Sequence, residues 1–410
     1  MAMEQVGLNV NGKNPWKNCD GLQKLSPAYT VGSVIVFFLC ALGLTVCRYE
    51  TVSTALIALS VGYVIWIVRR ASVMVSLFVV AGLLASLSSD LIVGAVFLAL
   101  VVGTMSGAFL LTTRKLPILV TLLIPIVAVG ASYSITHNIE ISLLALLFTP
   151  ASICLAVATR KDSLRTKTLL ACMGGFLLAI VACAVFAIWK TTGGLNRSCV
   201  LAFVDTARNA VVNFMVQQKE AMLQFLAQQP AEVQTAELVA QIEETLSDDA
   251  IKRTVSALFN VFPALITVVT ALLAFFAQML LTAAYGRVGL EKVVTPKMRM
   301  LTVSLTAAIV FAICFVLTML LPDSPALAAA MNLMIMLMPI FLLCGIQTLL
   351  AIAQAAPGAR LFLIFIMGAM FCYYSGGMLY LLAIFGAYGR ISAAIRQKLA
   401  SRMDSDQGNG

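Results

Sequence analysis

The sequence predicts an all-α protein, a polytopic integral membrane helix bundle with an external amphipathic helical insertion. Three observations predict this fold. Hydrophobic residues make up 61% of the chain and charged residues 11%, against roughly 45–50% and about 25% in an ordinary soluble domain. The apolar residues form continuous runs of about 20, the length of a helix that crosses the hydrocarbon core. Basic residues cluster in every second gap between these runs, which is the positive-inside pattern.

The chain begins with a polar tail, residues 1–27, and continues with a seven-helix N-terminal membrane region, residues 28–189. We expect its apolar segments at 28–47, 51–68, 71–88, 91–111, 116–135, 141–159 and 168–189. The runs are continuous rather than alternating, which favours helices over barrel strands. The first run is longer than a signal-peptide core of roughly 7–15 residues, so we expect an uncleaved span with a cytoplasmic N-terminus.

Residues 190–258 form a polar island in which we expect an external helical hairpin. Its apolar side chains recur at helical spacing and define one face: Leu201, Val204, Val211, Met215, Met222 and Phe225. A second amphipathic stretch, from Glu232 to Leu246, follows Pro230. Ser247 with Asp248 and Asp249 predicts an N-cap and an acidic first turn for the next long helix.

A C-terminal membrane region, residues 259–389, precedes a basic tail at 390–410. We expect four apolar segments there, at 260–285, 300–321, 326–352 and 361–388. The last segment contains Tyr373 to Gly377 at its middle. A broken or re-entrant hairpin would keep the basic tail on the cytoplasmic side, whereas a plain span would place the tail outside. Both interpretations of 361–388 stay open.

The distribution of charge predicts the orientation. Twenty of the 27 Lys and Arg residues fall on one side under this scheme, in the alternate gaps and the two tails. The net charge of +9 therefore forms a basic rim for an anionic inner leaflet, rather than a nucleic-acid surface. We expect a multi-pass protein of the bacterial plasma membrane whose first partner is the lipid bilayer.

Motif searches predict no enzyme and no cofactor. The sequence has no GxxxxGK[ST] phosphate loop, no HExxH and no GxSxG. It has one histidine, His137, and no Cys/His cluster, which argues against a metal site. No charged residue lies near the centre of a span, which argues against a carboxylate-driven pump.

Polar side chains inside the later spans are the candidate ligand-binding residues. A small-solute pocket would use the few groups that form hydrogen bonds at membrane depth: Gln278, Asn332, Gln347, Tyr373 and Tyr374. Gly376 and Gly377 would allow the helix to unwind there. Hydrogen bonding between helices explains the same residues without any ligand. Prolines inside spans, Pro263 among them, predict kinks.

Small residues recur at intervals of four in the segment 91–111: Ala95, Ala99, Gly103 and Gly107. Such a stripe lets two helix backbones approach closely. Ordinary packing within the chain is the favoured interpretation, and docking of another subunit is the alternative.

Several stretches of the second half resemble a known family. They are Phe259 to Leu265, Tyr285 to Gly289, Pro296 to Arg299, Pro339 to Gly345 and Leu381 to Arg390. Over about residues 245–400 the chain resembles the YybS-like family of bacterial membrane proteins, domain of unknown function 2232. That family is distantly similar to the substrate-binding membrane subunits of energy-coupling-factor transporters, which borrow an ATPase from partner chains. The resemblance implies solute binding or transport with ATPase or transmembrane partner subunits. The alternative is a non-transporting scaffold or regulator that acts through the external helices.

Overall fold

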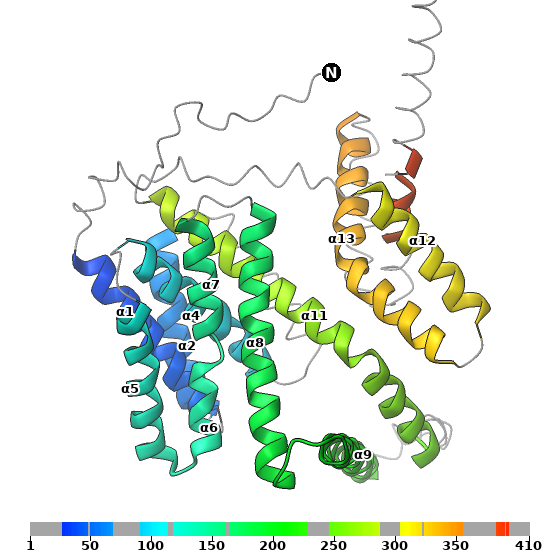
Figure 1. The fold of residues 1–410 in the computed structure, drawn as a ribbon, viewed down its shortest axis with the longest axis horizontal. Helices are drawn as coiled ribbons and strands as arrows, with labels where there is room; N and C mark the ends of the chain where they lie inside the picture. Colours follow the sequence, from blue (N-terminus) through cyan, green and yellow to red (C-terminus); the bar gives the residue numbers. More distant parts are fainter. Residues whose placement is uncertain are drawn as a thin grey trace, which may run out of the picture. The chain divides into compact units, whose positions relative to one another are not determined.

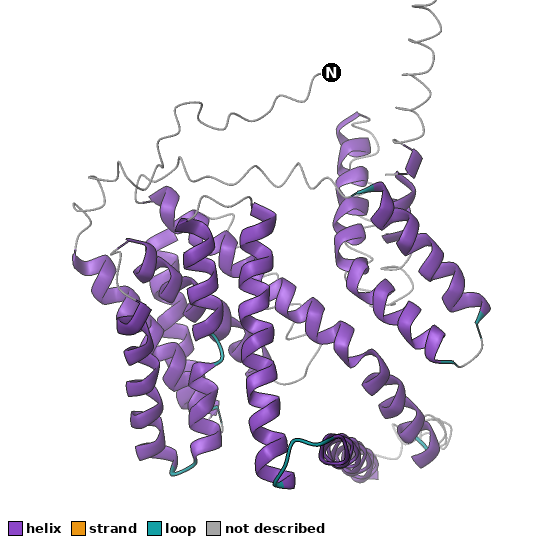
Figure 2. Cartoon of the chain, in the orientation of Figure 1, coloured by secondary structure: helices purple, strands orange, loops and turns teal. Residues whose placement is uncertain are grey.

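A computed structural model describes residues 27–47, 50–68, 91–113, 118–160, 165–227, 246–287, 304–321, 324–355, 383–389 and 391–392. Helices and short loops account for all of this part of the chain (Figure 2). The chain divides into two units, described here one at a time. Unit 1 comprises Met1–Phe186 and Val269–Pro296, and unit 2 comprises Ala187–Val268 and Lys297–Gly410.

Figure 1 labels the helices in chain order. Unit 1 contains α1 (Pro27–Thr45), α2 (Glu50–Val68), α4 (Leu91–Thr113), α5 (Ile118–Thr136), α6 (Ile139–Leu143), the 3₁₀ turn η2 (Leu144–Leu146), α7 (Thr149–Arg160) and most of α8 (Arg165–Thr192). Unit 2 contains α9 (Arg197–Ala227), α12 (Leu305–Leu320), α13 (Pro325–Ala355) and a helical stretch at 383–389. The 40-residue α11 (Asp248–Arg287) contributes to both units.

Within the described residues, six helices are long and apolar enough to cross a membrane. Their apolar portions are Ala28–Thr45, Gly94–Thr113, Lys167–Thr192, Arg197–Leu226, Asp248–Tyr285 and Pro325–Leu342. Four further apolar helices of 10–17 residues are present. The predicted all-α membrane bundle is therefore confirmed, and the chain is a multi-pass membrane protein.

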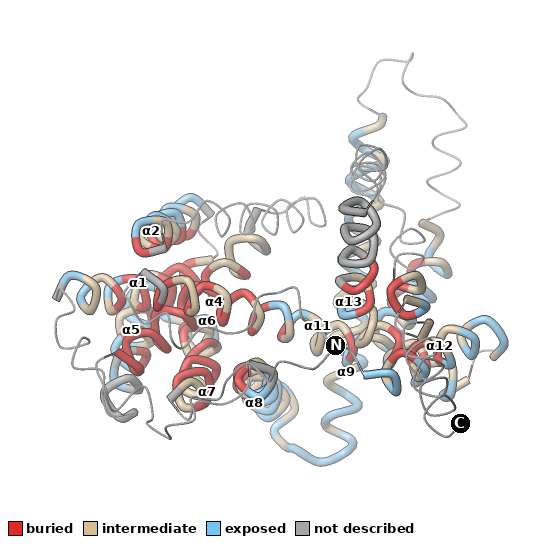
Figure 3. The backbone as a smooth tube through the Cα atoms, turned by 90° about the horizontal axis from the view of Figure 1, so that it is seen from above, coloured by how far each residue is buried: buried red, intermediate tan, exposed pale blue. Residues whose placement is uncertain are grey.

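The core of unit 1 forms around α4, whose residues are largely buried (Figure 3). A Cβ atom on Gly103 would lie 3.0 Å from the ring of Phe148, and one on Gly107 would lie 2.7 Å from both Phe37 Cε2 and Ser152 Oγ. The small-residue stripe thus faces α1 and the beginning of α7. Packing within the chain, the favoured interpretation, is what the structure shows.

Ring pairs and close contacts give the relative directions of the helices in unit 1. Along α4 and α11, Phe97 contacts Phe276 and Phe109 contacts Tyr285, so these helices run parallel. Gly103 meets Phe148 and Gly107 meets Ser152, so α4 also runs parallel to α7. The predicted alternation of spans gives these three segments the same direction, and the contacts agree with it.

The predicted segment 141–159 is not one helix. After α6 the chain forms the η2 turn, bends at Leu147 and Phe148, and begins α7 at Thr149. Pro150 explains the break, because a proline fits the first turn of a helix and has no N–H with which to continue the preceding one. Pro150 is one of the prolines for which the sequence predicts a kink, and the structure has a full break there instead of a kink. The predicted segment 71–88 and the stretch Glu232 to Leu246 lie outside the described residues.

In unit 2, α9 contacts the beginning of α11. The guanidinium carbon of Arg208 lies 5.7 Å from the centroid of the Phe259 ring, and Lys219 Nζ lies 3.6 Å from Asp248 Oδ1. The two contacts follow opposite order along the two helices, so α9 and the beginning of α11 run in opposite directions. The second arm of the predicted hairpin, Glu232 to Leu246, lies outside the described residues. The Ser247 cap is confirmed, since its Oγ accepts a hydrogen bond from the N–H of Ala250 at 3.3 Å. The helix then continues through residue 258 without a break.

The helices α12 and α13 pack against each other around a second apolar cluster. The rings of Phe311 and Phe341 lie 4.9 Å apart between centroids, and Cys314 and Cys344 are buried beside them. Gly386 approaches the backbone of α13 at Phe341 and Gly345 so closely that a side chain would not fit. The C-terminal helical stretch is thereby held on α13.

Candidate functional site

The most distinctive polar arrangement in unit 2 begins with Pro263 in α11. A proline has no backbone N–H and its ring clashes with the carbonyl four residues earlier, so it weakens the helical hydrogen-bond ladder around it. In a regular helix the N–H of Ala264 would donate to the carbonyl of Asn260. Ala264 is fully buried, so the pairing of its N–H matters for stability.

The side chain of Asn332, on α13, bridges these two backbone groups. Its Oδ1 accepts a hydrogen bond from the Ala264 N–H at 3.1 Å, and its Nδ2 donates to the Asn260 carbonyl at 2.8 Å. Nδ2 also donates to the carbonyl of Ala328, one turn earlier on α13, at 2.8 Å. The amide of one helix thus bonds both backbone groups of one rung of the ladder in another. We call this arrangement the amide bridge.

The amide bridge uses both N–H donors of Asn332 on backbone carbonyls. An asparagine amide has two donors and an oxygen with two lone pairs, so an acceptor position remains. The interhelical hydrogen bonding weighed for this residue is therefore present. A solute that accepted a hydrogen bond from Asn332 would have to displace one of these carbonyls.

Aromatic side chains lie beside the bridge on α11. The rings of Phe259 and Phe262 stack with their centroids 6.1 Å apart. Arg208 from α9 covers Phe259, a cation–π contact. Pro263 and Asn260 are themselves exposed. The amide bridge therefore connects α13 to an exposed surface of α11.

The other predicted ligand-binding residues are placed as follows. Gln278 lies on α11 in unit 1, where only 4% of its surface is exposed, and Asn332 lies in unit 2. Gln347 belongs to α13, but its side chain lies outside the described residues, as do Tyr373 and Tyr374 entirely. The structure describes two of the five side chains, and these belong to different units.

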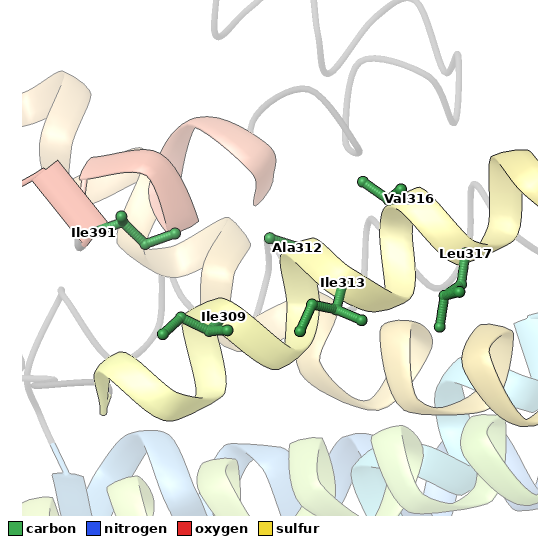
Figure 4. A pocket seen from close by; sticks show the side chains of 6 residues that line it. All are labelled: Ile309, Ala312, Ile313, Val316, Leu317 and Ile391. Carbon is green, nitrogen blue, oxygen red and sulfur yellow. The ribbon is translucent and has the colours of Figure 1, made fainter.

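An apolar groove lies on α12 in unit 2. It has a volume of about 380 Å³ and is lined by Ile309, Ala312, Ile313, Val316, Leu317 and Ile391. Figure 4 shows the first five on one side of α12 and Ile391 approaching from the C-terminal stretch. None of these side chains forms hydrogen bonds, so the groove suits a hydrocarbon chain and not a polar solute. Sequence reasoning did not distinguish these residues from any other lipid-facing side chains.

Sequence reasoning also missed the pairing of Asn332 with Pro263. It identified both residues, one as a kink and the other as a polar group in a span. The signal in the sequence that could have predicted this contact was a proline in one span and an asparagine in another. Among the described residues, no three His, Cys, Asp or Glu side chains come together.

Comparison with known proteins gives one match. A family model described as a predicted membrane protein, DUF2232, matches residues 108–387. No curated protein and no solved structure matches the chain. The matched range includes the broken segment of α6 and α7, both helices of the amide bridge and the α12 side of the groove. It covers more than half of the sequence. The chain therefore belongs to the DUF2232 family of predicted membrane proteins.

Proposed function

We propose that the protein is a transporter-like subunit of the bacterial plasma membrane that binds a small solute and has no ATPase of its own. Its N-terminus is cytoplasmic, and an ATPase or transmembrane partner supplies the energy. This proposal extends the resemblance to the YybS-like proteins and to the substrate-binding subunits of energy-coupling-factor transporters. The fold alone carries no assignment of function.

The interruption of apolar helices is the observation that supports the proposal. One interruption separates α6 from α7 at Leu144–Phe148. The second feature is the turn of the continuous helix α11 around Pro263, where the Asn332 amide bonds two backbone groups. Transporters build their sites from discontinuous helices because interrupted segments expose backbone donors and acceptors at membrane depth. A side-chain amide that already bonds such a segment provides exchangeable hydrogen bonds for a solute.

A stability screen tests the proposal. The purified protein in detergent is heated with vitamins, nucleobases and small polar metabolites, and its unfolding temperature is measured. A ligand at 100 times its dissociation constant stabilises the folded state by about 2.7 kcal/mol, so a true solute raises the unfolding temperature in proportion to the logarithm of its concentration. A flat response across the panel contradicts the proposal.

A matched pair of variants locates the solute. Gln347→Leu removes a predicted ligand-binding amide, whereas Gln224→Leu removes an exposed amide of α9. For Gln347→Leu, the ligand concentration that gives the same shift of the unfolding temperature should rise at least tenfold. For Gln224→Leu, that concentration should not change. Equal responses of the two variants would exclude Gln347 from the site.

The second candidate function is a non-transporting scaffold or regulator that acts through the external helices. The observation that favours it is α9, in which none of the described residues is buried. A pulldown from native membranes distinguishes this function. Deletion of residues 200–246 should abolish capture of a specific partner while membrane insertion is retained, and the solute screen should be flat.

A further inference from the structure

The helix α9 has two chemically distinct faces. Successive residues of a helix rotate by about 100°, which gathers large apolar side chains on one face, with Gln218 as a polar residue among them: Val200, Phe203, Val211, Phe214, Met222 and Phe225. Polar side chains gather on the opposite face: Thr206, Asn209, Asn213, Gln217, Glu220 and Gln224. The three phenylalanines recur every 11 residues, close to three helical turns, so they form one stripe. We call this face the phenylalanine face.

The contacts of α9 within unit 2 leave the phenylalanine face open. Its contacts with α11 come from Arg208 and Lys219, which lie on the flank between the two faces. The side chains of Phe214 and Phe225 are 60% and 62% exposed. Large apolar surfaces that nothing covers mark a site of interaction with a membrane or a partner.

The position of α9 in the chain favours lipid as that partner. The preceding helix α8 is strongly apolar, with a mean hydropathy of 2.6 in an 18-residue window within Lys167–Thr192. Trp189 and Lys190 in its last turn are residue types that mark the membrane–water boundary. The chain then turns at Gly193, which has a φ of 72°. Asn196 caps α9 by accepting the N–H of Cys199 at 3.0 Å. With four residues between the helices, α9 begins at the boundary where α8 ends.

The polar content of α9 argues against a second crossing. Its length and its most apolar 18-residue window, with a mean hydropathy of 1.4, satisfy the requirements of a span. However, Asp205, Arg208 and Lys219 lie well inside the helix, and a charged residue at the bilayer centre costs about 2.5–3.5 kcal/mol on insertion scales. A helix with one apolar face and one polar face lies in the plane of the interface instead.

We propose that α9 is an interfacial helix whose phenylalanine face is inserted into the boundary between headgroups and acyl chains. The partner is the lipid surface, not a second copy of the chain or another protein. The polar face is directed to water. The contacts of Arg208 with Phe259 and of Lys219 with Asp248 then attach α11 to a helix that rests on the membrane.

Tryptophan reporters test this proposal in proteoliposomes of phosphatidylcholine. The three native tryptophans are replaced by phenylalanine, and one tryptophan is introduced as Phe214→Trp or, as the matched control, as Asn209→Trp. Lipids brominated near the headgroup end of the acyl chain quench from the membrane side, and iodide quenches from the water. We expect bromolipid to quench the Phe214→Trp reporter at least twofold more strongly than the Asn209→Trp reporter, with the reverse order for iodide.

Three results would overturn the proposal. Equal iodide quenching at both positions would place the phenylalanine face in water. Strong quenching of both positions by lipids brominated deep in the acyl chain would make α9 a span. Shielding of the Phe214→Trp reporter from both quenchers would show that protein covers it. Phe225→Trp, with Gln224→Trp as its control, repeats the comparison if the Phe214 variant does not fold.

Discussion

At the scale of single residues, the amide bridge shows how a side chain can maintain a helix that its own sequence weakens. Pro263 removes a donor from α11, and the Asn332 amide bonds the N–H and the carbonyl of the next rung, Ala264 to Asn260. Backbone groups in lipid need partners within the protein, since water is absent there. The helix weakened by Pro263 in α11 thereby explains why a polar residue, Asn332, lies in α13.

A double-mutant cycle tests this account. Asn332→Leu should lower the free energy of unfolding by about 1–3 kcal/mol, because the buried Ala264 N–H loses its partner. In the Pro263→Ala background the same substitution should cost less than half as much, because the regular ladder can re-form. Detergent unfolding followed by circular dichroism measures both values. Equal costs in the two backgrounds would mean that Asn332 acts through packing alone.

At the scale of elements, adjacent glycines of α8 have different roles. A Cβ atom on Gly175 would lie 2.6 Å from the Cα of Ala151, a backbone atom of α7 that has no rotamer with which to move away. A Cβ atom on Gly174 meets nothing within 4 Å. The two positions therefore separate the cost of close packing from the intrinsic effect of glycine in a helix.

We expect Gly175→Ala to destabilise the protein by about 1–3 kcal/mol, since the two helices must move apart. Gly174→Ala should be neutral or stabilise by up to about 1 kcal/mol, because alanine is the better helix former. Thermal unfolding of the purified variants in one detergent gives both values. If the two substitutions had the same effect, α7 and α8 would not be in backbone contact at Ala151.

Apolar runs predicted most helices of this chain well, and local chemistry explains where they did not. The run 168–189 corresponds to α8, and 326–352 corresponds to α13. The segment expected at 260–285 begins at Asp248 instead, because the Ser247 cap starts a helix that continues into the apolar run. The candidate site was harder to predict. Asn332 and Pro263 are recognisable in the sequence, but their contact depends on which helices pack together.

At the scale of the whole molecule, the parallel course of α4, α7 and α11 agrees with the alternation of charged gaps. These contacts give the directions of the helices relative to one another. Which ends are cytoplasmic stays a prediction, and cysteine labelling tests it. An impermeant thiol reagent should label Gln217→Cys in intact cells, because it lies on the exposed polar face of α9. It should label Thr295→Cys only after permeabilisation. The parent chain, with its ten cysteines, gives the background labelling. Labelling of Thr295→Cys in intact cells would mean that the predicted orientation is reversed.

The amide bridge also has a consequence for biosynthesis. Asn332 is synthesised 68 residues after Ala264, which at about 5–20 residues per second is a delay on the order of 3–14 s. During this interval α11 enters the membrane with a ladder weakened by Pro263 and without the Asn332 amide on Ala264 and Asn260. Its completion therefore depends on the arrival of α13, and a chain truncated between these helices exposes an unpaired N–H that quality-control machinery can recognise.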